Sequence, residues 1–350
     1  MSSASNACPS QTGSNPWSAR SSGCCSTDER CLSNDYLDEV RITCIPGMPP
    51  LRLRDLPSFC LVTDSSDIMF RNGIIQTQGT LPAAALILNT FDELEGPVLD
   101  ALSVNFPVYA MGPLLLSQSF HCNDKDGSFD ELSMWKEESS CLTWLDTRKP
   151  SSVMYVCLGS LAVLSNEQLL EFAWGLASSN QSFLWVVRPD MVHGESAILP
   201  KEFIEETKGR GLLVGWAPQI KVPSHPSVGG FLTHSGWNST LESISAGVPM
   251  ICWPFFAEQQ TNAKYVCEEW RIGMQVKKTV QREELAMLVR NLIKGEEGNK
   301  MRRRVGKLKD TAKRAVEDGG SSNTNLDKLL SQIFLKRMHQ IIVQNVDADR

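Results

Sequence analysis

Short apolar runs alternate with amphipathic stretches through the second half of the chain. Each run holds four to six residues and is followed by a glycine, a proline, an aromatic or a polar residue. Runs of this length are typical of buried strands, and the stretches between them repeat apolar residues at helical spacing. The alternation predicts an α/β fold with a parallel sheet covered on both faces. The predicted strands are Val153–Leu158, Phe183–Val187, Leu212–Gly215, Val228–Thr233 and Val248–Trp253.

The helices between these strands carry start and stop signals. Ser165 and Gln168 have the spacing of a capping box, which predicts a helix start at that point. A helix from about Asn238 is expected to stop at Gly247, because Pro249 follows closely. Further helices are predicted at residues 257–269, 282–294, 299–317 and 326–335.

A strand, a helix and a second strand are predicted earlier in the chain, at Ala84–Leu88, Phe91–Leu102 and Val108–Met111. They have the order expected for the last part of a βαβ series. A free-standing domain of that type normally needs several such units. This part of the chain is therefore expected to form only part of a domain.

Composition narrows the class of protein. The 350 residues are enough for two domains, each with its own core. The net charge of −6 argues against a nucleic-acid-binding protein, which is usually basic. No apolar run approaches the ~18 residues of a membrane span, and the N-terminus lacks the hydrophobic core of a signal peptide. Eleven cysteines without a C-x-x-C pair indicate reduced thiols, so we expect a cytoplasmic location.

Several polar segments are expected to carry no site. Residues 1–30 lack apolar periodicity and should be disordered, and the cysteines at 24–25 have no second pair of metal ligands near them. Residues 117–133 are irregular and predict a linker or surface loop, in which the D-x-D sequence at 124–126 is interpreted as solvated surface. The basic run at 300–304 shares its helix with regularly spaced apolar residues, so we interpret it as the solvated face of a packed helix rather than as a phosphate-binding patch.

Polar and aromatic groups follow the predicted strands. Ligands of doubly wound sheets bind at the carboxyl ends of the strands, so these groups are expected to meet at one edge. Their mixture of rings, amides, carboxylates and a Gly/Asn/Ser turn fits a nucleotide sugar, which has a flat base, an anionic middle and a hydroxyl-rich end. The groups are Ser160, Arg188, Trp216 with Gln219, His234–Ser239, and Glu258 with Gln259.

Two of these groups fit the base and the phosphates. Trp216 offers a flat face on which a uracil ring can stack, an interaction worth about 1–3 kcal/mol. A core position is the alternative, but the Ala-Pro-Gln that follows breaks the strand and favours exposure. The turn from His234 to Ser239 precedes a helix whose free N–H groups attract an anion such as a pyrophosphate. Gly236 permits close backbone approach within that turn.

The remaining candidates have competing interpretations. Ser239 and Glu242 fit the S-x-x-E capping box, and Glu242 near a diphosphate would be repelled unless it faces the ribose hydroxyls. Glu258 and Gln259 open a helix and supply acceptors and donors for the hydroxyls of a hexose. An exposed acidic first turn is the alternative for that pair. His225 is interpreted as structural rather than catalytic.

The stretch from Trp216 to Gln259 closely resembles the signature box of plant family-1 UDP-glycosyltransferases. WAPQ, the two histidines, GWNS, Glu242, GVP and the closing Glu-Gln all stand in register, and Pro223 replaces the usual leucine. The resemblance extends from about residue 35 to about residue 335, through the CLGS turn and the NTFDELE and RLRDLPSF segments. Within the family, the sequence most resembles the branch of enzymes that glucosylate cyanohydrins and iridoids such as 7-deoxyloganetin.

The resemblance implies two Rossmann-like domains of the GT-B type, the N-terminal one incomplete and the C-terminal one a complete doubly wound parallel sheet. It divides the chain into residues 1–30, unrelated to the family, 31–132 as a partial acceptor-side domain with linker, 133–320 as the UDP-sugar-binding domain, and 321–350 as a helix and tail. It further implies inverting transfer of glucose from UDP-glucose to a hydroxyl of a small plant aglycone. The UDP-sugar and the acceptor are then the partners, and no metal or other cofactor takes part.

The donor-binding residues that the resemblance implies match the parts of UDP-glucose. A glutamine at the end of the box is associated with glucose as the donor sugar. The residues are Trp216 for stacking on uracil, Gln219 and Glu242 for the ribose, Ser160, His234, Asn238 and Ser239 for the phosphates, Trp237, Glu258 and Gln259 for the sugar, and Ala217 within the same box.

The acceptor side departs from the family pattern. In the family, a histidine near the N-terminus, oriented by an aspartate, deprotonates the acceptor hydroxyl. The first histidine of this sequence is His121, in the predicted linker, so we expect the segment that carries the base to be missing and the chain to be truncated. A general base contributes about 10²–10⁴-fold to a rate. The alternative function is therefore a catalytically inactive product that binds a UDP-sugar.

Overall fold

The computed structural model describes residues 34–117, 137–192, 199–277 and 279–335. The expectations for residues 1–30, with the cysteines at 24–25, lie outside the described residues. So does the D-x-D sequence at 124–126, with nearly all of the predicted linker.

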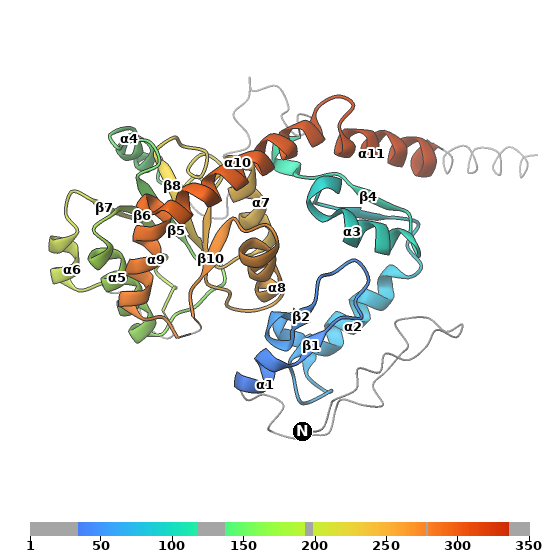
Figure 1. Ribbon diagram of the computed structural model, residues 1–350, viewed down its shortest axis with the longest axis horizontal. Helices are drawn as coiled ribbons and strands as arrows, with labels where there is room; N and C mark the ends of the chain where they lie inside the picture. The colour runs from blue at the N-terminus through green and yellow to red at the C-terminus, as the bar shows by residue number, and fades with distance from the viewer. Residues whose placement is uncertain (1–33, 118–136, 193–198, 278, 336–350) are drawn as a thin grey trace, which may run out of the picture.

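A six-stranded sheet forms the centre of the second half of the chain (Figure 1). Its order is β10-β9-β8-β5-β6-β7, and all neighbouring strands are parallel. Five strands confirm the apolar runs to within two residues at each end, whereas the sixth has the mixed sequence Gly-Met-Gln, which gives no strand signal. The strands are β5 (Val153–Cys157), β6 (Ser182–Val186), β7 (Gly211–Val214), β8 (Val228–Thr233), β9 (Met250–Cys252) and β10 (Gly273–Gln275).

Helices cover both faces of this sheet, and successive residues of β5 alternate between the two cores. Tyr155 lies in the core beneath α7 (Trp237–Ala246) and α10 (Glu296–Val316), where its ring stacks on Phe231 at 4.8 Å between centroids. The next residue, Val156, lies with Trp185 in the core beneath α5 (Asn166–Ser179) and α9 (Arg282–Lys294). All five residues of β5 are buried, which confirms the doubly wound arrangement.

The helix starts confirm one predicted capping box and correct another. At α5 the Gln168 backbone N–H donates to Ser165 Oγ at 3.2 Å, and the Ser165 N–H donates to Gln168 Oε1 at 3.0 Å. At α7 the residue before the helix is Gly236, and no side chain caps it. The predicted capping box of Ser239 and Glu242 is therefore wrong, because Ser239 already lies inside the first turn.

Several helices differ in length from the predicted ones. The helix predicted at 257–269 is a short α8 (Gln259–Lys264) continued by a π-helical turn over Tyr265–Glu269. The last one, α11 (Ser321–Leu329), starts five residues before the predicted position, 326, and is likewise continued as a π-helix to Leu335. Two helices of six or seven residues, α4 (Ser140–Asp146) and α6 (Lys201–Glu206), are too short to show a helical period in the sequence.

The first half of the chain contains the predicted strand, helix and strand. Strands β3 (Leu86–Leu88) and β4 (Val108–Ala110) are parallel neighbours, with α3 (Asp92–Ser103) between them in sequence. Helix α11 crosses from the second half to this part (Figure 1), where the Asn325 side chain donates to the Ala110 carbonyl at 3.0 Å. The elements before them are α1 (Asn34–Glu39), β1 (Arg41–Ile42), β2 (Leu51–Arg52) and α2 (Ile68–Thr80).

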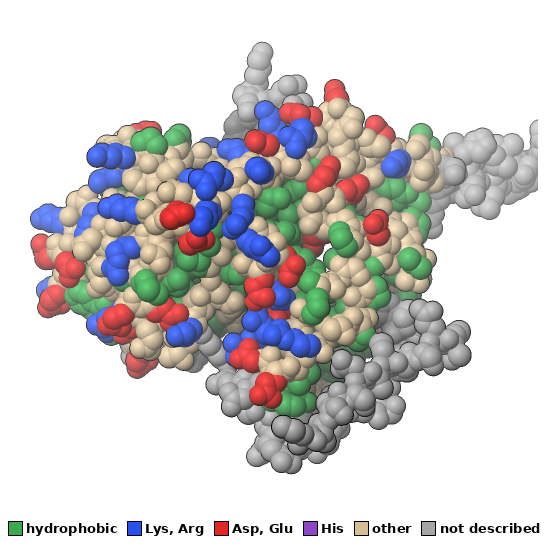
Figure 2. Space-filling model, viewed as in Figure 1, with side chains coloured by type: hydrophobic (Ala, Val, Ile, Leu, Met, Phe, Trp, Pro, Cys, Tyr) green, Lys and Arg blue, Asp and Glu red, His purple; other side chains and the backbone are tan. Residues whose placement is uncertain are grey.

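Helix α10 has the two faces expected from its sequence. Met301 and Val305 are buried against the sheet. Lys and Arg side chains gather on its outer side (Figure 2). This confirms that the basic run at 300–304 belongs to a packed helix.

No described helix combines the length and the apolar character that crossing a membrane requires. The described cysteines, Cys44, Cys60, Cys141, Cys157, Cys252 and Cys267, are free thiols.

Two glycines of α10 provide a matched test of the packing. A Cβ at Gly298 would lie 2.1 Å from the Leu292 carbonyl oxygen, whereas a Cβ at Gly306 would meet no atom within 4 Å. We expect Gly298→Ala to lower the free energy of unfolding by about 2 kcal/mol or more, because backbone must move. Gly306→Ala should raise it by about 0.5–1 kcal/mol through better helix propensity. Urea denaturation measures both, and equal effects of the two variants would contradict this packing of α10.

Candidate functional site

The candidate site lies at the carboxyl edge of the six-stranded sheet. Strands β5 and β8 are neighbours at its centre, and the chain proceeds from β5 toward β7 on one side and from β8 toward β10 on the other. The crevice beside such a reversal is the usual ligand site of a doubly wound sheet. Ser160 follows β5 and His234 follows β8, so both lie at this reversal.

The strand order also sorts the other predicted residues. Trp216 and Gln219 follow β7 at one margin of the sheet, and Glu258 and Gln259 follow β9 on the opposite side of the centre. With strands about 4.8 Å apart, the four intervals from β7 to β9 span about 19 Å. The candidate residues for base, phosphates and sugar therefore lie in that order along one edge, which suits an elongated ligand.

The imidazole of His234 is packed between two glycine backbones. A Cβ at Gly159 would lie 2.7 Å from His234 Cε1, and a Cβ at Gly236 would lie 2.5 Å from His234 Nε2. Gly159 also has φ +78°, a conformation that favours glycine. Burial lowers the pKa of His234 to about 4, so the ring is neutral near pH 7. A neutral imidazole has one N–H group, so it can donate one hydrogen bond to an anion but carries no positive charge.

The N-terminus of α7 supplies donors beside His234. Helix α7 has ten residues, and its first backbone N–H groups have no carbonyl partner one turn earlier. Ser235, in the turn before the helix, adopts φ +63°, and its carbonyl accepts a hydrogen bond from Asn262 Nδ2 at 2.9 Å. Asn262 was not expected at the site, because it lies 27 residues away in the sequence. The hydrogen bond from Asn262 thus fixes the turn that precedes α7, and helix N-termini of this kind are able to bind anions.

Glu242 lies in the second turn of α7, and burial raises the pKa of its carboxyl to about 7. A large fraction of this carboxyl is therefore protonated at neutral pH. The protonated form does not repel a diphosphate and can exchange hydrogen bonds with hydroxyl groups.

The turn that carries Trp216 is fixed by a distant carboxylate. Glu138 Oε1 accepts a hydrogen bond from the Gly215 N–H at 2.7 Å, and the Glu138 N–H donates to the Trp216 carbonyl at 3.0 Å. Trp216 and Gln219 are half-buried, whereas Ala217 between them is buried. Glu138 has no recognisable signal in the sequence, because it acts across 77 residues.

Two of the predicted sugar-binding residues, Gln259 and Trp237, also form hydrogen bonds within the protein. Gln259 is buried, and its side-chain Oε1 accepts hydrogen bonds from the N–H groups of Phe255 and Phe256 at 2.8 and 3.0 Å. The side-chain NH₂ of Gln259 is then the group that remains for a ligand. Trp237 donates its indole N–H to the Asn89 carbonyl at 2.8 Å, which ties α7 to the first half of the chain.

Arg188 follows a strand, but its side chain contacts the protein backbone and is not available to a ligand. Its guanidinium is buried, and it donates to the carbonyls of Ser160 and Ala162 at 2.6 and 2.8 Å. It also forms an ion pair with Asp190 at 3.1 Å. Arg188 therefore shapes the loop after β5 that presents Ser160.

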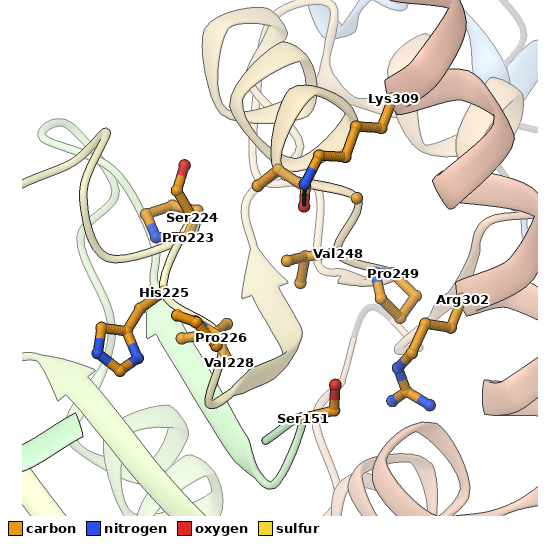
Figure 3. A pocket seen from close by; sticks show the side chains of 12 residues that line it. Ser151, Pro223, Ser224, His225, Pro226, Val228, Val248, Pro249, Arg302 and Lys309 are labelled. Atoms are coloured by element: carbon orange, nitrogen blue, oxygen red, sulfur yellow. Dashed lines mark hydrogen bonds between the residues drawn. The ribbon is translucent and has the colours of Figure 1, made fainter. Parts of the chain in front are cut away.

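A cavity of about 300 Å³ lies at the opposite, amino edge of the sheet (Figure 3). His225 borders it and is held by Ser227 Oγ at 2.8 Å and by Asp146 Oδ1 at 3.1 Å, which fits the structural interpretation. Arg302 and Lys309 also line it, and both donate to backbone carbonyls. The cationic groups here hold α10 against β8, α9 and the end of α7, and the cavity is separate from the candidate site.

Within the ranges that the structure describes, no group of three or more His, Cys, Asp or Glu side chains is arranged to hold a metal ion.

Comparisons with known proteins show what this chain is similar to. A family model described as UDP-glucoronosyl and UDP-glucosyl transferase matches residues 132–310. The chain is 48% identical to 7-deoxyloganetin glucosyltransferase of Catharanthus roseus over 314 residues, which cover 89% of this chain and 64% of that protein. It is 49% identical to linamarin synthase 1 of Manihot esculenta over 315 residues, 89% of this chain and 65% of that protein. The chain thus spans less than two thirds of the length of these relatives.

Solved structures show the same likeness. The structure of Phytolacca americana UGT2 complexed with UDP-2fluoro-glucose and pterostilbene is similar, with a TM-score of 0.72 and 37% sequence identity. The match covers 87% of this chain and 66% of that one. TcCGT1 in complex with UDP is also similar, with a TM-score of 0.72 and 33% identity over 84% of this chain and 65% of that one.

The raised pKa of Glu242 predicts a pH-dependent stability. Burial favours the neutral form of the Glu242 carboxyl. The contribution of this group to the free energy of unfolding is therefore fully present below the unfolded-state pKa of 4.5, and it is lost as the pH rises to about 7. The difference between the two pKa values, 4.5 and about 7, corresponds to about 3 kcal/mol. We expect Glu242→Gln to match the unmodified protein at pH 4 and to exceed its free energy of unfolding by about 3 kcal/mol at pH 8. Urea denaturation across this range is the measurement.

Glu205→Gln, on the exposed side of α6, is the control and should show no such pH-dependent gain. A Glu242→Gln gain that is the same at every pH would show that burial does not disfavour the charged form of Glu242.

Proposed function

Because the chain belongs to the UDP-glucoronosyl and UDP-glucosyl transferase family, we propose that its carboxyl-edge site binds UDP-glucose and that the protein transfers glucose to a hydroxyl of a small plant aglycone. The order of candidate groups along the sheet edge is the observation that supports this best. Trp216 follows the marginal strand β7, the His234 turn follows the central strand β8, and Glu258 follows β9. Base, diphosphate and hexose are connected in that same order in a UDP-sugar.

The proposed roles divide the ligand among these residues. The uracil stacks on Trp216 beside Ala217, and Gln219 and Glu242 bind the ribose hydroxyls. The sugar lies against Trp237, Glu258 and Gln259. The phosphates are held by Ser160, His234, Asn238 and Ser239. In this proposal residues 31–132 form the acceptor side, 133–320 form the UDP-sugar-binding domain, and 321–350 form a C-terminal helix and tail.

The proposed reaction proceeds with inversion at C1 of the glucose. The acceptor oxygen forms a bond to C1 while the bond between C1 and the β-phosphate oxygen breaks, and the acceptor proton passes to a base. Negative charge then collects on the β-phosphate, next to the N-terminus of α7. The helix N–H groups and dipole stabilise that charge and cost no reorganisation during the step. In this proposal the helix takes the place that a metal ion has in other phosphate sites.

The alternative, a chain that binds a UDP-sugar without turnover, has no support among the relatives, which are named as glucosyltransferases or as a synthase. The described residues include two histidines, His225 and His234. His225 is committed to Ser227 and Asp146, and His234 belongs to the proposed phosphate site. The acceptor base is therefore not among the described histidines.

The uracil proposal predicts a specific loss of affinity. Replacing Trp216 by Ala removes a stacking contact of about 1–3 kcal/mol, so the Kd for UDP should rise about tenfold or more. Isothermal titration calorimetry with UDP is the measurement. Trp174→Ala is the control, since that indole lies on α5, packs on Phe203 of α6 and should affect stability without changing the Kd. An unchanged Kd in Trp216→Ala would remove the stacking assignment.

The transfer reaction predicts acceptor-dependent release of UDP from UDP-glucose. Relatives act on 7-deoxyloganetin and (R)-mandelonitrile, as their names state, so these are the acceptors to supply. We expect UDP release to require an acceptor and to continue in excess EDTA. UDP binding without acceptor-dependent release would favour the non-catalytic alternative, and loss of release in EDTA would contradict the metal-free proposal.

A further inference from the structure

Ser58, in the first half of the chain, and Ala257, in the second, exchange two backbone-directed hydrogen bonds. The Ser58 N–H donates to the Ala257 carbonyl at 2.8 Å, and the Ala257 N–H donates to Ser58 Oγ at 2.8 Å. The two residues are 199 positions apart in the sequence. Both polar groups of the Ala257 backbone are therefore satisfied by one serine of a distant segment.

Ala257 needs such support because of its conformation. Its φ is +55°, in the left-handed region that residues with a Cβ rarely adopt. Ala257 directly precedes Glu258 and Gln259, so its conformation sets the direction in which both leave the loop. Gln259 Oε1 already closes this loop onto Phe255 and Phe256. Rotation at Ala257 would thus displace the side chains at the sugar end of the proposed site.

The segment around Ser58 is itself fixed on α8. The Thr261 hydroxyl donates to the Asp55 carbonyl at 2.7 Å, and the Asp55 carboxylate accepts from the Arg52 N–H at 2.8 Å. Arg52 also forms an ion pair with Glu268 at 2.6 Å, one turn beyond α8. Residues 52–58, which we call the docking segment, thus contact the start and the end of this helical region (Figure 1).

We propose that Ser58 is a positioning residue for recognition of the donor sugar. Its hydroxyl holds Ala257 in the left-handed conformation and thereby places Glu258 and Gln259 for the hexose. This inference rests on the proposed binding of a UDP-sugar and adds a residue from the opposite half of the chain. Because the residues proposed for the uracil and the diphosphate follow other strands, we expect the effect of Ser58 to be largest for the sugar.

The test compares the affinities of the full chain for UDP, UDP-glucose and UDP-galactose by isothermal titration calorimetry. Ser58→Ala removes the acceptor for the Ala257 N–H and keeps the Ser58 N–H. We expect the Kd for UDP to change less than twofold and the Kd for UDP-glucose to rise about fivefold, the effect of one hydrogen bond. The preference for UDP-glucose over UDP-galactose should fall by the same factor. Ser58→Thr, which retains a hydroxyl, should keep the affinity and the preference of the unmodified protein.

Ser66→Ala is the matched control, because that hydroxyl donates to nearby Asp64 within the same loop. An unchanged preference in Ser58→Ala, or a loss of UDP affinity equal to the loss of UDP-glucose affinity, would overturn the positioning role. Equal affinity of the unmodified protein for both sugar nucleotides would overturn it too, because the protein would then not distinguish the two sugars and Ser58 could have no role in recognising them. Failure of the unmodified protein to bind UDP would instead overturn the proposed function itself.

Discussion

The fit of His234 between two glycines is the contact on which the candidate site depends. A Cβ at Gly159 or at Gly236 would approach the imidazole to less than 3 Å, so neither position accepts another residue without movement. The ring thereby joins the loop after β5 to the loop after β8, the two strands at which the chain reverses across the sheet. Ser160 and the N-terminus of α7 keep their spacing through this contact. The arrangement of this turn thus follows from close packing rather than from paired charges.

Several of the hydrogen bonds between the two halves of the chain go to backbone carbonyls. Trp237 donates to the Asn89 carbonyl, and Thr261 donates to the Asp55 carbonyl. Such bonds fix the position of the backbone, whatever side chain the accepting residue carries. The apolar cores belong largely to the six-stranded sheet and its helices. Phe91 and Leu94 of the first half also lie in the core beneath α7 and α10, so the contact between the halves is partly apolar.

The sequence was most informative where one local rule determines the structure. Strands buried on both faces are apolar throughout, so β8 could be predicted residue for residue, and Ser165 with Gln168 specified a helix start. Contacts between residues far apart in the sequence could not be predicted in this way. Glu138 bonds to Gly215 over 77 residues, and Asn262 reaches the Ser235 carbonyl because α8 folds back beside α7. The ionisation of the site is hidden for the same reason, since it depends on burial created by the whole fold.

The hydrogen bond from Trp237 to the Asn89 carbonyl makes the two sides of the molecule thermodynamically dependent on each other. Asn89 also accepts from the Leu114 N–H through its side chain, so the indole is connected to the turn that follows β4. A molecule that shifts this indole must alter a contact of the first half. Coupling of this kind is reciprocal, so a molecule that holds Asn89 in place changes the affinity at α7 by the same factor. One indole N–H would then connect the affinities of the two sides equally in both directions.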